Sequence, residues 1–368
     1  MPKALKMALK IIFGIVAALV IIVAGYIAYM QFSYYRIDDN VELGIDRNPS
    51  MGLQLNETYS AVTYNIGFGA YTPDYTFFMD EGVMPDGTHT WGVHSWAKSK
   101  ESVIESTEGV ISVVRDQKPD FMLFQEVDVE STRSHKVDQK ALLESAFKDY
   151  GSVYAVNFHS SFLAFPFTEP HGIVNAGLLT LTDKHVDSAV RRSYPVDNAF
   201  ITKFFDLDRC FAVLRIPVEN GKQLVLINSH MSAYDEGGLI RALQLNLLCS
   251  TLRDEAEQGN YVVVGGDWNH ALCGSVDIYP SVQLVAPWVA TFDESVLPEG
   301  FSVVRPSNLE DVPTCRGDDI PYEKGVTYTT TVDGFIVSSN VEATAQNCNT
   351  EFEYSDHNPV LLSFKLKA

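Results

Sequence analysis

A run of twenty residues without a charge, Ile11 to Met30, constrains this chain more than any other stretch. The run is long enough to cross the hydrocarbon of a bilayer as one helix, and lysines at positions 3, 6 and 10 precede it. A cleaved signal peptide starts in a similar way, but its apolar core is shorter and ends at a small-x-small site, for which this sequence has only a poor candidate. We therefore predict an uncleaved transmembrane anchor over residues 11–30.

The basic start also sets the expected topology. By the positive-inside rule, residues 1–10 stay cytoplasmic and the chain after Met30 lies outside, as in a single-pass membrane protein with an extracytoplasmic domain. Residues 31–56 contain Asp, Asn, Pro and Gly that interrupt every periodicity, so they are predicted to be a linker. One domain, residues 57–368, is expected to follow, because no comparable break and no internal repeat appears there.

The charge of the exported part bears on its partners. The whole chain has 47 acidic and 27 basic residues and a net charge of -20, which becomes -23 without the three N-terminal lysines. An electropositive face for long nucleic acid is therefore not expected, although a local pocket can still be positive. Nucleic acid stays an alternative partner that the charge disfavours.

Strand-like and helix-like segments alternate along the domain. Helices are expected at 101–117, 139–148 and 239–257 from their apolar spacing, and Asn220-Gly221 is a strong hairpin signal between two strands. Strands paired by hairpins, with helices inserted between them, favour an α+β sandwich of two sheets over a doubly wound parallel sheet. The expected strands are 59–66, 121–124, 153–158, 176–181, 210–218, 223–228, 261–264, 326–337 and 359–366.

The stretch Tyr261 to His270 is the most informative part of the domain. It reads as a buried strand that breaks at two glycines and delivers Asp267 and Asn269 to the strand end. Oxygen ligands of this kind suit a hard divalent cation and the surroundings of a phosphate. By itself the stretch is equally compatible with a turn that has an Asx cap.

Polar side chains stand where several other strands end, which makes a shared site the stronger interpretation. Six segments spread over some 290 positions have this arrangement. The residues are Asn65, Glu126, His230, Asp267 with Asn269, Asp333, and Asp356 with His357.

These segments resemble, in order, the motif set of the endonuclease/exonuclease/phosphatase superfamily, which includes deoxyribonuclease I, abasic-site endonucleases, neutral sphingomyelinases and inositol-polyphosphate 5-phosphatases. The resemblance covers nearly all of residues 57–368. It implies a four-layered αββα sandwich with one site at the sheet edges that works with magnesium, with manganese or calcium as alternatives. The motifs are Tyr64-Asn65, Gln125-Glu126-Val127-Asp128, Asn228-Ser229-His230-Met231, Gly266-Asp267-Trp268-Asn269, Val332-Asp333-Gly334-Phe335-Ile336 and Ser355-Asp356-His357-Asn358-Pro359-Val360.

The resemblance also implies a role for each residue. Glu126 corresponds to the principal metal ligand and Asn65 to its neighbour, while Asp356 is a second metal-binding or water-positioning carboxylate. Asp267 and Asn269 match the pair that positions the attacking water and a phosphate oxygen.

The two histidines complete the implied site. His357, oriented by Asp333, corresponds to the base or the phosphate-contacting imidazole. His230 matches the histidine that stabilises the pentavalent phosphorus or protonates the leaving oxygen. Phosphodiester hydrolysis needs charge neutralisation and proton transfer, and these residue types supply both.

Some residues have structural alternatives. Asn65 can cap the turn at Gly67-Phe68-Gly69, and Asp333 can satisfy backbone amides. Asn175 is a candidate substrate contact because the family often has an Asn before such a strand. Arg191-Arg192 is interpreted as a solvated loop pair. The aromatic segment 70–98 is either a recognition lip on the catalytic side or a cover for one sheet.

Three functions are consistent with these observations. The leading hypothesis is a membrane-anchored, metal-dependent phosphoesterase that prefers lipid headgroups or small phosphodiesters, because the anchor keeps the domain beside a membrane. The second is an extracytoplasmic DNA or RNA nuclease. The third is a catalytically silent binding protein on the same fold, which has no need of both His230 and His357.

Overall fold

The structure is a computed structural model that describes residues 2–197, 199–200, 202–233 and 238–368. Within these residues the chain forms two seven-stranded sheets, two short hairpin-like sheets and four α-helices. The helices are α1 (Lys3–Ser33), α2 (Lys100–Gln117), α3 (Gln139–Ala146) and α4 (Leu239–Glu257).

The first large sheet has the strand order β1-β9-β10-β11-β12-β16-β13. Its central pair, β11 and β12, is parallel, and its other pairs are antiparallel. The predicted hairpin at Asn220-Gly221 is confirmed, because Gly221 has a φ of 81° and β10 pairs with β11 across the turn. The strands are β1 (Val41–Glu42), β9 (Ser188–Ser193), β10 (Cys210–Pro217), β11 (Gln223–His230), β12 (Tyr261–Asp267), β13 (Phe301–Val303) and β16 (Asp333–Ser338).

The second large sheet has the order β17-β18-β3-β6-β8-β7-β2, with β3 and β6 parallel. Two further pairs, β4 (Glu81–Val83) with β5 (His89–Trp91) and β14 (Cys315–Arg316) with β15 (Thr329–Thr330), lie outside the large sheets. The second sheet comprises β2 (Ile45–Asp46), β3 (Thr58–Asn65), β6 (Phe121–Asp128), β7 (Gly151–His159), β8 (Asn175–Thr182), β17 (Val341–Asn347) and β18 (Val360–Leu366).

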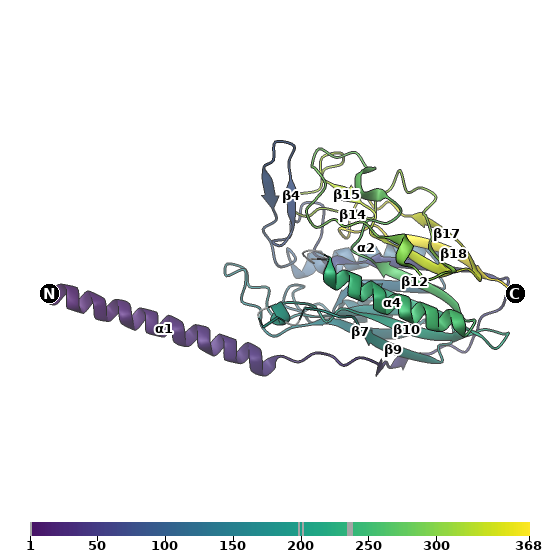
Figure 1. Ribbon diagram of the computed structural model, residues 1–368, viewed down its shortest axis with the longest axis horizontal. Helices are drawn as coiled ribbons and strands as arrows, with labels where there is room; N and C mark the ends of the chain where they lie inside the picture. The colour runs from purple at the N-terminus through teal and green to yellow at the C-terminus, as the bar shows by residue number, and fades with distance from the viewer. Residues whose placement is uncertain (1, 198, 201, 234–237) are drawn as a thin grey trace.

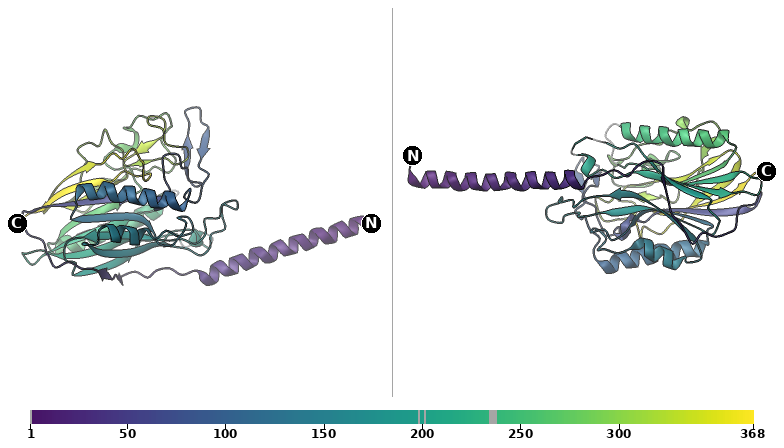
Figure 2. Two further views of the ribbon diagram at one scale, coloured as in Figure 1. Left: turned by 180° about the vertical axis from the view of Figure 1, so that it is seen from behind. Right: turned by 90° about the horizontal axis from the view of Figure 1, so that it is seen from below.

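The two sheets pack face to face, and helices cover the outer faces (Figure 1; Figure 2). One apolar cluster lies between the sheets and includes Leu123, Leu226 and Phe335. A second cluster joins α4 to the first sheet, and a third joins α2 and α3 to the second sheet. The layers are therefore helix, sheet, sheet, helix, which confirms the predicted αββα sandwich.

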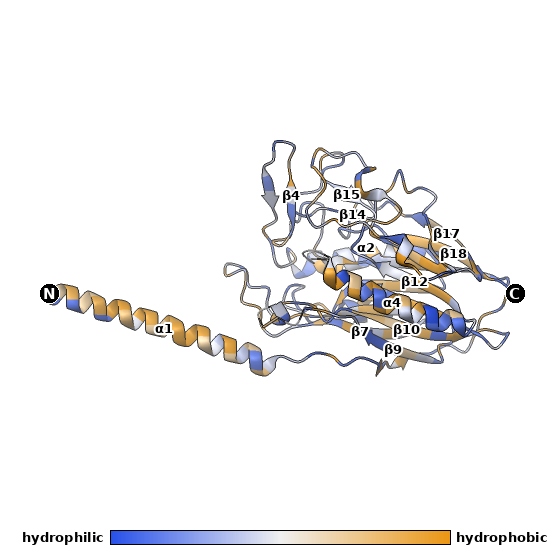
Figure 3. Ribbon diagram, viewed as in Figure 1, coloured by the Kyte–Doolittle hydropathy of each residue, from blue (hydrophilic) through white to orange (hydrophobic). Residues whose placement is uncertain are grey.

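Helix α1 stands apart from the sandwich. It is a single helix of 31 residues whose most apolar window is not buried, and it projects away from the domain (Figure 1; Figure 3). Its length and composition are sufficient to cross a membrane, as they also are in a signal sequence.

The segment between α1 and β3 is attached to the sandwich. β1 pairs with β9 at the edge of the first sheet and β2 pairs with β7 at the edge of the second, and Leu53 is buried in the core between the sheets. The segment therefore adds a short strand to each sheet. The boundary at residue 57 stays a prediction.

The interpretation of Arg191-Arg192 as a solvated loop pair is wrong for Arg191. This residue lies in β9, and its buried guanidinium donates hydrogen bonds to the carbonyl oxygens of Val156 and Asp208 at 2.8 and 2.7 Å. A guanidinium has five N–H donors, and those carbonyl oxygens satisfy two of them inside the protein. The arginine pair interrupts the apolar pattern, and for this reason the sequence did not indicate β9.

Candidate active site

The register of the first sheet brings three predicted residues to one edge. In the parallel pair, His230 of β11 is opposite Asp267 of β12, and in the antiparallel pair Asp267 is opposite Asp333 of β16. His230, Asp267 and Asp333 are thus neighbours on adjacent strands at the same end of the sheet.

The second sheet reaches the same edge. Asn65 ends β3, where it is opposite Gln125 of β6, and its amide nitrogen donates a hydrogen bond to Asp267 Oδ2 at 3.0 Å. On the neighbouring strand, the side-chain amide of Gln125 donates a hydrogen bond to Asn228 Oδ1 at 2.8 Å, which links β6 to β11. Both bonds are buried and cross from one sheet to the other, so they fix the relative position of the two strand ends.

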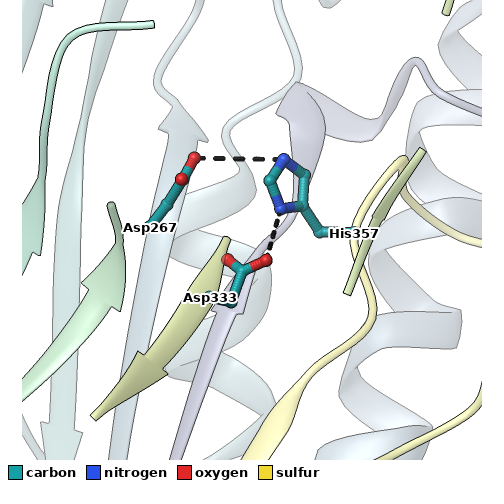
Figure 4. A group of neighbouring side chains, drawn as sticks. All are labelled: Asp267, Asp333 and His357. Carbon is teal, nitrogen blue, oxygen red and sulfur yellow. Dashed lines mark hydrogen bonds and ion pairs between the residues drawn. The ribbon is translucent and has the colours of Figure 1, made fainter. Parts of the chain in front are cut away.

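His357 is held between two carboxylates (Figure 4). Its Nδ1 is 2.7 Å from Asp333 Oδ2, and its Nε2 is 3.9 Å from Asp267 Oδ2 and 3.7 Å from Asp356 Oδ2. Burial alone would lower the pKa of His357, but the negative charge of Asp333 and the other nearby acidic groups outweighs burial and raises this pKa well above its usual range. Asp333 therefore orients the imidazole through Nδ1 and leaves Nε2 facing the other carboxylates.

Asp267 is the centre of the cluster. Its side chain is buried and accepts hydrogen bonds from Asn65 and from the backbone N–H of Asn269 at 2.8 Å, and it lies 3.2 Å from His230 Nε2. Burial would raise the pKa of this carboxyl, but His230 and His357 outweigh it and lower the pKa. Asp267 thus stays a charged acceptor inside the protein.

His230 approaches Asp267 from the other side. Burial and the positive charge of Arg209 lower its pKa, and the charge of Asp267 opposes this effect only in part. Its Nδ1 lies 3.5 Å from the amide nitrogen of Asn157. A neutral imidazole that donates from Nε2 to Asp267 is consistent with these contacts.

Glu126 has an unusual backbone conformation. The strand β6 continues to Asp128, beyond the predicted end at Phe124, and its register with β8 shifts between Phe124 and Val127. Glu126 lies in this irregularity with a φ of 56°, which is costly for a residue with a Cβ. Glu126 lines the same cavity as Asp267 and His357.

Oxygen donors of the type that suits a divalent cation lie on this side of the cluster. Asn65 is linked to the neighbours of both carboxylates: it pairs with Gln125, next to Glu126, and its carbonyl oxygen accepts a hydrogen bond from Ser355, next to Asp356, at 2.8 Å. Its side-chain oxygen also accepts the Gly67 N–H at 3.0 Å, so Asn65 caps the turn at Gly67-Phe68-Gly69 as well. A Cβ at Gly67, where φ is 50°, would come within 2.7 Å of Asp356 Oδ1, so the glycine leaves room beside this carboxylate. Two carboxylates and a carboxamide are ligands that Mg²⁺ accepts.

A second acidic group has a different chemistry. Asp267, Asp333 and His357 offer ligand atoms within 4.8 Å of one another. His357 Nδ1 is hydrogen-bonded to Asp333, and its Nε2 lies 3.9 Å from Asp267, which is beyond hydrogen-bond distance; we call this group the Asp333–His357–Asp267 relay.

The sequence matches the family model described as the Endonuclease/Exonuclease/phosphatase family over residues 62–357, a range that includes each of the cluster residues named above. The chain belongs to this family. A search of curated proteins gives no match.

Solved structures of the endonuclease/exonuclease/phosphatase family share the fold. A family protein from Beutenbergia cavernae is 15% identical with a TM-score of 0.55, and the match covers 85% of this chain and 72% of that one. One from Leptotrichia buccalis is 14% identical with a TM-score of 0.54, covering 84% and 100%. TDP2 from Caenorhabditis elegans is 15% identical with a TM-score of 0.52, covering 84% and 75%.

In this family member most of the cluster lines a cavity of about 460 Å³. The cavity also has apolar lining residues, which include Phe77 and Phe78 from the aromatic segment 70–98 together with Leu163 and Phe165. Within that segment Tyr71 and Tyr75 are buried. The aromatic segment therefore packs in one apolar cluster with Val103 of α2 and forms part of the cavity wall, whereas its role as a cover for one sheet stays a prediction.

Two of the predicted site residues, Asp333 and Asn175, do not line the cavity. Asp333 lies behind His357, to which it is hydrogen-bonded, whereas Asn175 has no such link to the cluster. Asn175 begins β8, and its backbone is bonded to Ser131 and Val129, while the next residue, Ala176, lines the cavity. A role for Asn175 in substrate binding stays a prediction.

Sequence reasoning missed two parts of the cavity wall. The first is the loop around Leu163 and Phe165, and the second is a set of three arginines, Arg133, Arg209 and Arg316. Arg133 makes a bidentate ion pair with Asp128 at 2.9 and 3.1 Å and lies over the ring of Phe68. No sequence motif marks these residues. The one signal available was that Arg133 follows Asp128, the last residue of the Gln125 to Asp128 motif, by five positions.

Proposed function

We propose that this chain is a membrane-anchored, divalent-metal-dependent phosphoesterase that hydrolyses phosphodiester bonds, with lipid headgroups or small phosphodiesters preferred as substrates. The observation that carries the proposal is the relay Asp333–His357–Asp267, joined to Asn65 of the other sheet and open to a cavity. Groups of this kind at one edge can activate water and protonate a leaving group.

Glu126, Asp356 and Asn65 are the residues that would hold magnesium, with manganese or calcium as alternatives. When bound, the ion neutralises charge on the phosphate oxygens. The carboxylate of Asp356 also lies 3.7 Å from His357 Nε2, so the metal side and the proton-transfer side of the site are adjacent.

Asp267 and Asn269 are proposed to position the attacking water. Asn269 is held by a hydrogen bond from its side chain to the carbonyl oxygen of Met231 at 2.8 Å, and its backbone N–H binds Asp267. The carboxylate of Asp267 can orient a water on the cavity side, because the bonds to Asn65 and Asn269 fix its plane.

The histidines are proposed to manage the proton. His357 presents Nε2 toward Asp267, since Nδ1 is engaged by Asp333, and Nε2 is therefore the atom at which a proton is held or moved. His230 supports Asp267 from the other side at 3.2 Å and contributes to stabilising charge on the phosphoryl group.

Membrane anchoring is proposed for α1. Its apolar window is exposed, and three lysines precede the apolar run, whereas Arg36 is the one basic residue among the ten that follow it. The anchor would leave the acidic domain on the extracytoplasmic side and close to lipid headgroups.

The test is hydrolysis of bis-p-nitrophenyl phosphate by the purified full chain in detergent with magnesium or manganese. His357→Ala and Asp267→Ala should each lose most of the activity. The matched controls are His89→Ala and Asp116→Ala at exposed positions outside the cavity, which should keep it. Activity that survives both site substitutions would remove the proposal.

A nuclease is the second candidate because three arginines line the cavity of an otherwise acidic domain. Binding of DNA or RNA should then weaken steeply as salt is added, whereas cleavage of headgroups should respond mainly to bilayer composition. If magnesium instead raises the melting temperature but no ester in a broad panel is hydrolysed, the chain is a silent binding protein on this fold.

A further inference from the structure

An uncharged, phenylalanine-rich loop borders the cavity. Residues 160–168 contain no charged residue, in a chain with 47 acidic ones, and Phe162, Phe165 and Phe167 are 40%, 56% and 84% exposed. Phe200, at 57% exposed, packs on Phe204, which belongs to the same apolar cluster as Leu163 of the loop. We name Phe162, Phe165, Phe167 and Phe200 the phenylalanine rim. Exposed aromatic side chains gathered in this way indicate a binding surface.

The rim is fastened to the end of α1. The hydroxyl of Tyr26 bonds to the Phe162 carbonyl oxygen at 3.0 Å and accepts from the Ala164 N–H at 3.1 Å. The hydroxyl of Tyr29 accepts from the Phe162 N–H at 3.2 Å, and Met30 is buried among Leu163 and neighbouring apolar side chains. The last turns of α1 and the rim therefore form one packed unit.

This attachment sets the depth of the rim relative to a bilayer. The uncharged run 11–30 is about 30 Å long as a helix, which equals the hydrocarbon thickness, so its C-terminal tyrosines lie at headgroup level. The rim is hydrogen-bonded to those same tyrosines. The helix leaves the sandwich from the end opposite the C-terminus, on the side where the β4–β5 hairpin projects (Figure 1; Figure 2).

One residue of the rim, Phe165, also lines the active-site cavity. It packs edge-on against Phe78, another lining residue, with ring centroids 5.9 Å apart. Leu163 of the same loop lines the cavity as well. Leu163 and Phe165 thus connect the loop that is bonded to α1 with the wall of the active-site cavity.

We propose that the phenylalanine rim inserts into the outer leaflet of the membrane that α1 spans, so that the cavity opens onto the lipid surface. The occupant of this surface is the bilayer itself, because the loop has no charge and is bonded to the anchor. The substrate would then be an amphiphilic phosphodiester that enters from the leaflet. Insertion rests on the proposed anchoring, and the substrate class rests on the proposed phosphoesterase activity.

Insertion is tested with the full chain reconstituted in phosphatidylcholine vesicles. Phe167→Trp adds a tryptophan to the rim. Glu342→Trp adds one at an exposed position of β17, opposite Lys365 near the C-terminal end of β18. Lipids brominated on the acyl chains should quench most of the added emission at position 167 and leave that at 342 unchanged. Equal emission with and without bromine at position 167 overturns the proposal. A blue-shifted but unquenched emission there also overturns it, since it means that protein covers the rim.

The consequence for catalysis is tested separately. In the variant Phe167→Ser/Phe200→Ser, hydrolysis of a phosphodiester lipid in vesicles should fall roughly tenfold, because two apolar side chains no longer partition into the leaflet. Hydrolysis of bis-p-nitrophenyl phosphate should not change. Met51→Ser, at an exposed methionine next to β10, is the matched control and should behave as wild type.

The two failures are distinguishable. If wild type hydrolyses neither ester, the proposed activity fails, while the quenching result still decides whether the rim inserts. If the double variant hydrolyses the vesicle substrate as well as wild type does, the rim has no part in substrate access and the inference fails, while the phosphoesterase proposal stands.

Discussion

Gly266 offers the sharpest test of how the fold positions the site. This glycine precedes Asp267 on β12 and is opposite Ser229 of β11, one residue before the pair His230 and Asp267. A Cβ built at Gly266 would lie 2.8 Å from the Ser229 carbonyl carbon and would overlap its carbonyl oxygen. The substitution Gly266→Ala must therefore push apart the two strands that carry the candidate catalytic residues.

The expected cost follows from this overlap. Carbon atoms in van der Waals contact lie about 3.5–4.0 Å apart, so β11 and β12 must separate by roughly 1 Å. Inserting a methyl group into a packed core costs about 1–3 kcal/mol, which lowers the melting temperature of a domain of this size by about 2–5 °C. A displacement of 1 Å at the 3.2 Å contact between His230 and Asp267 should also lower the hydrolysis rate by about 100-fold.

The assay is thermal unfolding of the full chain in detergent, together with hydrolysis of bis-p-nitrophenyl phosphate. Gly44→Ala is the control, because a Cβ at Gly44 meets nothing within 4 Å and the residue has no left-handed φ. We expect Gly44→Ala to melt and react like wild type. If Gly266→Ala does the same, the close approach of the strands does not matter and the reasoning is refuted.

Four further outcomes are expected. Glu126→Gly should be more stable to urea than Glu126→Ala by about 1 kcal/mol, because glycine tolerates the φ of 56°; equal stability would contradict the strain. Burial lowers the pKa of His171 from 6.5 to about 3, so the unfolded chain takes up its proton first as pH falls below 6.5. Urea titrations should therefore show about 2 kcal/mol less stability at pH 5 than at pH 7.5 from this group, a loss that His171→Phe removes. Asp333→Asn should lower hydrolysis by about 10²–10⁴-fold with a nearly unchanged melting temperature, and a rate like wild type would exclude the relay. EDTA should abolish hydrolysis and magnesium should restore it, and magnesium should raise the melting temperature of wild type but not of Glu126→Ala.

The sequence predicted those strands that are apolar on both faces. β12 and β11 lie between the inter-sheet core and the layer of α4, so nearly every side chain is apolar and the strands stand out. β17 and β18 are both buried on one face only. β18 was predicted because Leu362, Phe364 and Leu366 mark that face. β17 was missed because its buried face has only Val341, Ala345 and Asn347. β1 and β2 have two residues each, and only their partners β9 and β7 define them.

The site was predictable where it depends on strand ends. Asn65, His230 and Asp267 end strands whose registers bring them together, and a polar residue after an apolar run marks such an end in the sequence. The bulge at Glu126 was not predictable, because it depends on how β6 pairs with β8. The loop 160–168 was missed for a related reason, since its apolar residues pack on α1 and on the cavity rather than forming a periodic element.

The connection between α1 and the sandwich bears on how the proposed anchor works. A flexible linker of some 25 residues would let a domain take many orientations relative to the membrane. Here the connecting segment adds β1 to one sheet and β2 to the other, and Tyr26 and Tyr29 of α1 bond to the loop that lines part of the cavity. The orientation of the active site relative to α1 is therefore set by the fold. A phosphoesterase held in this way would meet substrates at the depth of the headgroups, whereas a nuclease acting on external nucleic acid would gain nothing from it.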